Sequence, residues 1–170
     1  MLSQDIFENQ VKIVYIAIGS NLGNRKKNIE LAKSYLQDYG IKIIKSSSFY
    51  ETLSWPDPKK PKFLNIIISA KSNFTPDKLI KIFKKIEKIL GRKKLKKNAP
   101  RECDIDLIDY KNKLISRNLQ VPHKRMHKRN FVLFPLYEIN KNWIHPKFKI
   151  SIKKLIFSLP INDIRSIKQI

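Results

Sequence analysis

A pair of aspartates inside an apolar run is the feature that most constrains the fold of this chain. Asp104 and Asp106 are separated by one isoleucine, and Cys103, Ile105 and Leu107 alternate with them. This alternation is typical of a β-strand with one face in the core, so both carboxylates should lie together on the opposite face. A rise of about 3.3 Å per residue would place their Cβ atoms roughly 6–7 Å apart.

Two carboxylates on one half-buried face repel each other and lose hydration unless a cation joins them. Mg²⁺ takes oxygen ligands and typically binds through one or two carboxylates together with substrate phosphates. Arg101 precedes the strand and offers a planar guanidinium that suits bidentate phosphate contact. The pattern therefore predicts a metal and phosphate site. A surface Asp-x-Asp pair bridged to nearby lysines is the alternative that spacing alone leaves open.

Length and composition limit the class of protein. The chain has 170 residues, which suits one domain with a full core. It contains no stretch of eighteen apolar residues, so we expect no membrane span. The first ten residues carry two acidic and no basic side chains, unlike a signal or transit peptide. The single cysteine excludes an intrachain disulfide and fits a reducing compartment. We therefore expect a cytoplasmic location.

The net charge of +22 has two explanations. Lysines that neutralise phosphates drive nucleic-acid binding, and a positive field favours the approach of a polyanion such as a nucleotide triphosphate. However, most of the basic residues are lysines, and isoleucine and asparagine, which also have AT-rich codons, are abundant. The basic residues are spread over nearly the whole chain, so we expect no specific nucleic-acid partner.

Hydrophobic periodicity predicts the order strand, helix, strand, strand, helix, strand. Gly40 suits the end of the first helix, Thr75 suits the N-cap of the second, and Gly91 suits its end. This order corresponds to the split βαβ arrangement of ferredoxin-like folds, an α+β class with a mostly antiparallel sheet flanked by helices. The predicted strands cover about residues 11–18, 42–52, 62–71 and 103–108, the predicted helices cover 25–39 and 76–90, and a proline-rich loop covers 53–61.

The last third of the chain is less regular. We expect a turn into a short strand at 110–115, a short helix within 125–140 and a final amphipathic helix at 150–159. The tail past Pro160 is expected to be peripheral. No repeat or linker divides the chain, so residues 1–170 are predicted to form one domain, in which 141–170 are a C-terminal extension that packs on the core.

Four motifs carry a family resemblance because they occur together and in order. They are YIAIGSNLGN at 15–24, FLN at 63–65, APR leading into DID at 99–106, and VPH followed by MHKRNFVL at 121–133. Over about residues 11–140 the chain resembles the 6-hydroxymethyl-7,8-dihydropterin pyrophosphokinases of folate biosynthesis. The resemblance implies a ferredoxin-like fold and two bound Mg²⁺ ions. It also implies transfer of a pyrophosphoryl group from ATP to the pterin hydroxymethyl group, with release of AMP. We expect the enzyme to act as a monomer.

The resemblance assigns the metal and triphosphate residues. Asp104 and Asp106 would bind the metal, and Arg92 and Arg101 would join them in catalysis. Charge builds up on phosphate oxygens during such a transfer, so cations should gather there. The nucleotide-binding set would be Glu87, Arg92, Arg101, His123 and Arg129.

Each of these assignments has a structural alternative. Arg92 could be a solvated cation at a helix end, and His123 could be a packed loop histidine. Arg129 could pair only with Glu138 or Asp109. Glu87 could be a solvated partner of Lys84 or Lys88. By resemblance, residues 92–99 form a cationic connector that closes over the nucleotide.

The pterin needs a flat slot between aromatic faces and an amide that reads its pyrimidine edge. Asn65 supplies a donor and an acceptor, Phe131 is the best stacking wall, and Phe63 or Trp55 would add another. Ser54 and Trp55 lie in the proline-rich loop, which would cap the pterin. Asn65 could instead be a strand-end turn residue, and Trp55 could belong to the core.

The chain departs from the family pattern at three positions. Asn98 stands where some members have a tryptophan, Lys124 replaces a common tyrosine, and Phe63 replaces a frequent tyrosine. Two other classes stay open: a basic nucleic-acid-binding protein or metal nuclease, and a catalytically dead relative that serves as an interaction module. The intact Asp104 and Asp106 argue against the second.

Overall fold

One antiparallel sheet organises the chain. The computed structural model describes residues 12–93, 98–116 and 119–170. Six strands form the sheet: β1 (Lys12–Ser20), β2 (Lys42–Ser46), β3 (Tyr50–Thr52), β4 (Phe63–Ser72), β5 (Asp104–Tyr110) and β8 (Lys168–Gln169). β1 lies in the centre between β4 and β5, and both β2 and β3 pair with β4. This leaves β5, the strand of the aspartate pair, at one edge.

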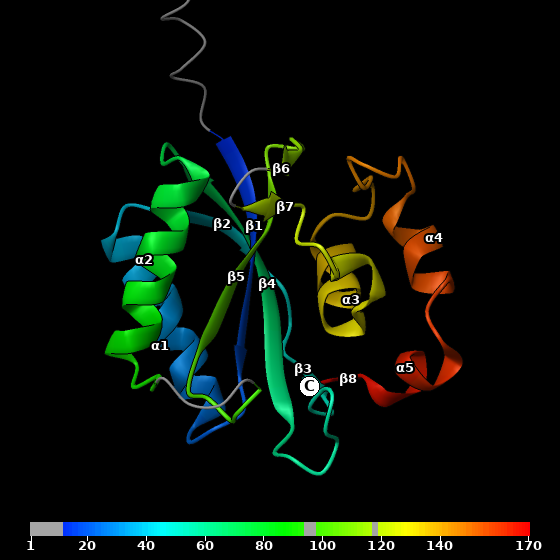
Figure 1. Cartoon of the computed structure of the whole chain (residues 1–170), viewed down its shortest axis with the longest axis horizontal. Coiled ribbons are helices and arrows are strands. Elements are labelled where there is room, and N and C mark those ends of the chain that lie inside the picture. Colours follow the sequence, from blue (N-terminus) through cyan, green and yellow to red (C-terminus); the bar gives the residue numbers. More distant parts are fainter. Residues whose placement is uncertain (1–11, 94–97, 117–118) are drawn as a thin grey trace, which may run out of the picture.

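Helices cover both faces of the sheet and make three layers (Figure 1). α1 (Arg25–Asp38) and α2 (Pro76–Ile89) cover one face. The opposite side holds α3 (Asn130–Ile139), α4 (Ile152–Phe157) and α5 (Ile161–Ser166). A small hairpin of β6 (Ile115–Ser116) and β7 (Gln120–Val121) and a 3-10 turn, η2 (Met126–Lys128), connect β5 to α3. Among the described residues, no helix has both the length and the apolar character needed to cross a membrane.

Strand alternation explains the two cores on the two faces of the sheet. Ile66 and Ile68 of β4 are buried in the core beneath α1 and α2, whereas Ile67 is buried in the second core with α3. The two predicted helices are confirmed together with their caps. The Asn24 side chain accepts a hydrogen bond from Lys27 N, and Thr75 accepts one from Lys78 N.

The predicted strand at 42–52 is wrong in one respect, because it is interrupted between β2 and β3. At the break the Ser47 hydroxyl accepts a hydrogen bond from Ile67 N. Glu138 of α3 accepts bonds from Ser48 N at 3.0 Å and from the Tyr50 hydroxyl at 2.8 Å. A carboxylate from 90 residues away therefore replaces a strand partner, and local periodicity carries no sign of it.

The tail past Pro160 has no buried residue, as expected of a peripheral segment, but it forms regular structure that the sequence did not predict. α5 and β8 follow the predicted final helix, and β8 pairs with β3 through Tyr50 and Gln169. Ile170 N donates a hydrogen bond of 2.9 Å to Phe49 O. Upstream of this tail, Trp143 and Leu155 are buried in the second core. The C-terminal segment thus completes the edge of the sheet that β3 forms.

Acid should destabilise this fold through His145. The ring is 4% exposed, and its Nδ1 accepts hydrogen bonds from Lys147 N and Phe148 N. Burial, followed by the charges of His127 and Lys147, lowers the pKa of His145 to about 4. Between pH 6.5 and about pH 4, His145 is therefore protonated in the unfolded state but neutral in the folded state. The free energy of unfolding falls as the pH drops through this window, because the unfolded state binds more protons.

Chemical denaturation at pH 7 and pH 4.5 checks this prediction. We expect the His145 contribution to the free energy of unfolding to fall by about 2–3 kcal/mol over that range. His145→Gln, which keeps a neutral acceptor, should lose that much less stability on acidification than the wild type. Equal losses in the two proteins would contradict the assignment.

Candidate active site

A cleft of about 680 Å³ lies beside the sheet, between the loop at 53–61 and the segment that leads into α3. Ala17 and Gly19 of β1 form part of its floor. Ten of the twelve predicted site residues line it: Ser54, Trp55, Phe63, Asn65, Arg101, Asp104, Asp106, His123, Arg129 and Phe131. The predicted residues Glu87 and Arg92 lie outside the lining.

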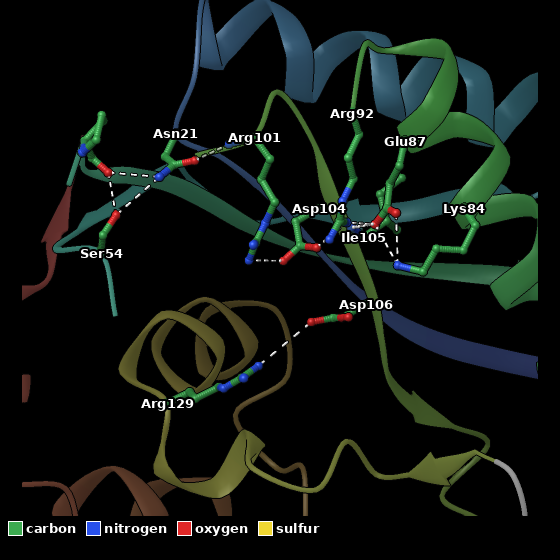
Figure 2. Close-up of polar contacts among 11 residues, drawn as sticks. Asn21, Ser54, Lys84, Glu87, Arg92, Arg101, Asp104, Ile105, Asp106 and Arg129 are labelled. Carbon is green, nitrogen blue, oxygen red and sulfur yellow. Dashed lines mark hydrogen bonds and ion pairs between the residues drawn. The ribbon is translucent and has the colours of Figure 1, made fainter. Parts of the chain in front are cut away.

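The aspartate pair occupies one face of β5, as predicted. Asp104 and Asp106 line the cleft, whereas Ile105 and Leu107 are buried in the core under α2. Arg101 Nη2 lies 2.8 Å from Asp104 Oδ2. Figure 2 shows this ion pair, with Asp106 directed toward the helical side of the cleft.

The two carboxylates have different electrostatic surroundings. Burial raises the pKa of Asp104, but the opposing charges of Arg101 and Arg92 outweigh burial and lower it below its ordinary value, so the group is ionised at neutral pH. Asp106 has a side chain 36% exposed, and its nearest cation is Arg129, at 3.8 Å. No described residue donates a hydrogen bond to its carboxylate. Asp106 is therefore open toward the cleft.

This donor set fits magnesium. Among the described residues, no cluster of three or more histidine, cysteine, aspartate or glutamate side chains forms a metal site. Structural zinc takes four protein ligands, whereas Mg²⁺ is bound through one or two carboxylates together with water and phosphate. Arg101 Nε is buried with no hydrogen-bond partner among the described residues. A phosphate oxygen in the cleft would satisfy this donor.

Glu87 supports the site and does not line the cleft, and its contact with nucleotide stays a prediction. It is 2% exposed and accepts a hydrogen bond of 2.8 Å from Ile105 N on the outer side of the edge strand β5. It also forms ion pairs with Lys84 at 2.9 Å and with Arg92 at 2.6 Å. The alternative that Glu87 pairs with Lys84 is confirmed, but the carboxylate is buried rather than solvated.

Arg92 connects this support to the aspartate pair. Its Nη1 lies 2.6 Å from Glu87 Oε1 and 2.6 Å from Asp104 Oδ1, so one guanidinium joins α2 to β5 (Figure 2). It is not a solvated cation at the helix end. Half of the predicted connector, residues 94–97, lies outside the described residues, and its closure stays a prediction.

His123 and Arg129 approach from the segment between β7 and α3. Burial, with the charges of Arg129 and Arg125, lowers the pKa of His123 although Asp106 opposes the shift, so the ring is neutral at neutral pH. The alternative partners of Arg129 are occupied elsewhere. Glu138 holds Ser48 and Tyr50, and Asp109 accepts a hydrogen bond from the Trp143 indole at 2.8 Å.

The predicted aromatic slot and its amide lie in the same cleft. Asn65 is 7% exposed on β4, opposite Gly19 of β1, and its Nδ2 donates to Thr52 Oγ1 at 3.1 Å. Phe63 is the first residue of the same strand, and Phe131, in the first turn of α3, also lines the cleft. Trp55 is 63% exposed, so the alternative of a core tryptophan is wrong.

Asn21 joins the two sides of the site, a role that the sequence did not indicate. It is buried, and its Nδ2 donates to Ser54 Oγ at 3.3 Å and to Pro61 O at 3.1 Å. Its Oδ1 accepts a hydrogen bond of 2.8 Å from Arg101 N (Figure 2). One amide therefore positions both ends of the loop at 53–61 and the backbone of a phosphate-binding candidate. Ser54, which is predicted to contact the pterin, lines the cleft and also accepts the hydrogen bond from Asn21.

Comparison with known proteins decides the family. The sequence model described as 7,8-dihydro-6-hydroxymethylpterin-pyrophosphokinase matches residues 15–141. The chain belongs to this pyrophosphokinase family. A 2-amino-4-hydroxy-6-hydroxymethyldihydropteridine pyrophosphokinase of Aquifex aeolicus is 39% identical over 142 residues, which are 83% of this chain and 88% of the relative. The Bacillus subtilis protein of the same name is 36% identical over 129 residues, 75% of this chain and 77% of the relative.

Larger relatives carry the same unit within longer chains. A folate synthesis bifunctional protein of Arabidopsis thaliana is 41% identical over 128 residues, which are 74% of this chain but only 26% of that protein. The crystal structure of Plasmodium falciparum HPPK-DHPS A437G with pteroate has a TM-score of 0.72 and 15% identity, and the match covers 95% of this chain and 47% of that one. This likeness supports the α+β ferredoxin-like fold.

Two of the three departures of this pyrophosphokinase from the family pattern, Asn98 and Phe63, line the cleft. Asn98 lines the cleft in the left-handed backbone region, with a φ of 62°, and its carbonyl accepts a hydrogen bond from Lys60 Nζ. The third departure, Lys124, is exposed and is not among the lining residues. A small polar side chain thus replaces the tryptophan expected near the pterin.

A methyl group at Gly19 should disturb pterin recognition by this pyrophosphokinase. A Cβ there would lie 2.8 Å from Asn65 Oδ1, closer than real Cβ atoms approach an oxygen. We expect Gly19→Ala to displace the amide and raise the KM for the pterin about tenfold, the cost of roughly one hydrogen bond. The KM for ATP should change less than twofold. Steady-state kinetics with each substrate varied in turn measures both, and equal losses would contradict the prediction.

Proposed function

We propose that the chain binds ATP and 6-hydroxymethyl-7,8-dihydropterin together in this cleft. The hydroxymethyl oxygen attacks the β-phosphorus of ATP and forms the new O–P bond. The bond from the β-phosphorus to the α,β-bridging oxygen breaks, and its electron pair leaves with AMP. The proton of the hydroxyl group is released to water. The products are AMP and the pterin diphosphate.

The observation that supports this proposal most strongly is the gathering of charge on one face of β5. Asp104 and Asp106 line the cleft with Arg101, whose Nε lacks a partner among the described residues, and with Arg129. We propose that the two aspartates hold two Mg²⁺ ions, which when bound neutralise phosphate oxygens and orient the reacting groups. Arg101 and Arg129 would bind phosphate oxygens by charge-assisted hydrogen bonds.

Arg92 has a positioning role in this proposal. Its guanidinium fixes Asp104 from one side and is itself held by Glu87, which is anchored to Ile105 N. The neutral His123 would accept or donate a hydrogen bond without adding charge. We include it with Arg101 and Arg129 in the nucleotide site.

The pterin would lie against Phe131 and Phe63, with its pyrimidine edge toward Asn65. Asn65 Nδ2 is held by Thr52, which fixes the orientation of the amide toward the cleft. Trp55 and Ser54 would approach from the loop at 53–61. This placement puts the hydroxymethyl group toward the aspartate pair, since β1, β4 and β5 are neighbours in the sheet.

Release of AMP from ATP, measured with and without the pterin, tests the proposal. We expect AMP and pterin diphosphate in equal amounts, dependent on Mg²⁺, and no AMP when the pterin is omitted. Release of ADP, or of AMP without the pterin, would exclude the proposed transfer. We also expect a monomer, which light scattering during size-exclusion chromatography checks.

A further inference from the structure

Three arginines in the cleft lie over aromatic rings that also line it. Each guanidinium carbon is 5.3–5.4 Å from the centre of its ring, within the range of cation–π contact. The aromatic members are the three rings proposed to surround the pterin. The pairs are Arg101 with Phe63, Arg125 with Trp55, and Arg129 with Phe131.

Arg125 differs from the other two arginines because it faces no carboxylate. Arg101 pairs with Asp104 and Arg129 approaches Asp106. Among the described residues, no aspartate or glutamate oxygen lies within ion-pair distance of Arg125. Its side chain is exposed, and its ring partner, Trp55, is 63% exposed. Arg125 is thus the arginine of the three that a ligand can draw away most easily.

The contact between Arg125 and Trp55 also joins two separate parts of the site. Trp55 belongs to the loop at 53–61, and Arg125 belongs to the segment that carries His123 and Arg129. In the absence of substrate, this contact therefore connects the loop proposed to cap the pterin with the segment proposed to bind the triphosphate.

The position of Arg125 favours a phosphate ligand. Arg125 lines the cleft together with His123 and Arg129. An anion bound in this part of the cleft would be attracted by both guanidinium charges. A charge-assisted bond from arginine to phosphate is also stronger than a cation–π contact at an exposed ring.

We propose that Arg125 is a further nucleotide-binding residue: when ATP binds, its guanidinium leaves the Trp55 ring and binds a phosphate oxygen, which frees the pterin-facing loop. This inference rests on the proposed function, because it takes the cleft to be the nucleotide site. It assigns to Arg125 a part in binding and in coupling the two substrate sides.

Tryptophan fluorescence measures the exchange directly. The chain has two tryptophans, and the other one, Trp143, is 3% exposed and bonded to Asp109. The protein is titrated with magnesium and a non-hydrolysable ATP analogue. We expect an emission change that disappears in Trp55→Phe. In Arg125→Ala, the emission without nucleotide should already resemble that of the nucleotide-bound wild type.

The same titrations give the affinity. We expect Arg125→Ala to raise the Kd for the analogue about tenfold, the loss of roughly one charge-assisted bond. Arg165→Ala serves as a matched control, because Arg165 is an exposed arginine that does not line the cleft. It should leave both the emission change and the Kd within twofold of the wild type.

Two results would overturn the inference while the proposed function stands. One is an unchanged Kd for the analogue in Arg125→Ala. The other is a Trp55 emission that does not change when the wild type binds the analogue. An emission of nucleotide-free Arg125→Ala equal to that of the nucleotide-free wild type counts in the same way. By contrast, failure of the wild type to bind the analogue or to release AMP with pterin present would remove the proposed function itself.

Discussion

Turnover should fall by about a thousandfold or more when Asp106 is replaced with asparagine, while the stability of the protein stays unchanged. A carboxylate that holds a metal at the reacting phosphates contributes several kcal/mol to the transition state, and about 1.4 kcal/mol corresponds to a factor of ten. The Asp106 side chain is 36% exposed, and its nearest cation is 3.8 Å away. The ion pair that the asparagine loses, with Arg129, is long and partly exposed, so we expect little change in stability.

AMP release and thermal denaturation measure the two parts of this prediction. Asp38→Asn, an exposed aspartate at the end of α1, is the matched control and should retain full turnover. Asp104→Asn should lose turnover as well, but it should also lose about 1–3 kcal/mol of stability, since Arg92 and Arg101 would lose a partly buried charged partner. If Asp106→Asn keeps a tenth of the activity, Asp106 is not a metal ligand.

Pterin binding should weaken about 30- to 100-fold in Asn65→Ala, whereas ATP binding should change less than twofold. The pyrimidine edge of the pterin would lose the donor and the acceptor that Asn65 supplies. A buried polar group without a hydrogen-bond partner costs about 1–3 kcal/mol. Calorimetric titration with each substrate separates the two effects.

Asn73→Ala is the matched control for Asn65→Ala. Asn73 lies just past the end of β4 and is exposed, so its replacement should leave both affinities unaltered. Comparable losses for pterin and ATP in Asn65→Ala would mean that Asn65 supports the sheet rather than reads the pterin.

The features that the sequence predicted well are those with a local cause. The helices at 25–38 and 76–89 have side-chain caps within their own first turn, and periodicity marks their buried faces. The aspartate pair follows from strand alternation, because Asp104 and Asp106 have the same parity. These relations depend on neighbours within four residues, which a sequence displays directly.

The features that the sequence did not predict depend on distant partners. The break between β2 and β3 is held by Glu138, which comes from the other side of the sheet. Glu87 of α2 accepts a hydrogen bond from Ile105 N because β5 is an edge strand, whose outward N–H groups have no strand partner among the described residues. Asp163 and Ser166 of α5 line the cleft, and both accept hydrogen bonds from Asn130 of α3. No local pattern reports these tertiary contacts.

The most direct test is the position of the metal in a crystal grown with a non-hydrolysable ATP analogue, the pterin and Mn²⁺. Anomalous density should appear between Asp104, Asp106 and the β- and γ-phosphates, with the hydroxymethyl oxygen facing the β-phosphorus. Metal density at another position, with Asp104 still paired with Arg92 and Arg101 and Asp106 still beside Arg129, would contradict the metal site. It would also contradict the proposed transfer, which depends on that site.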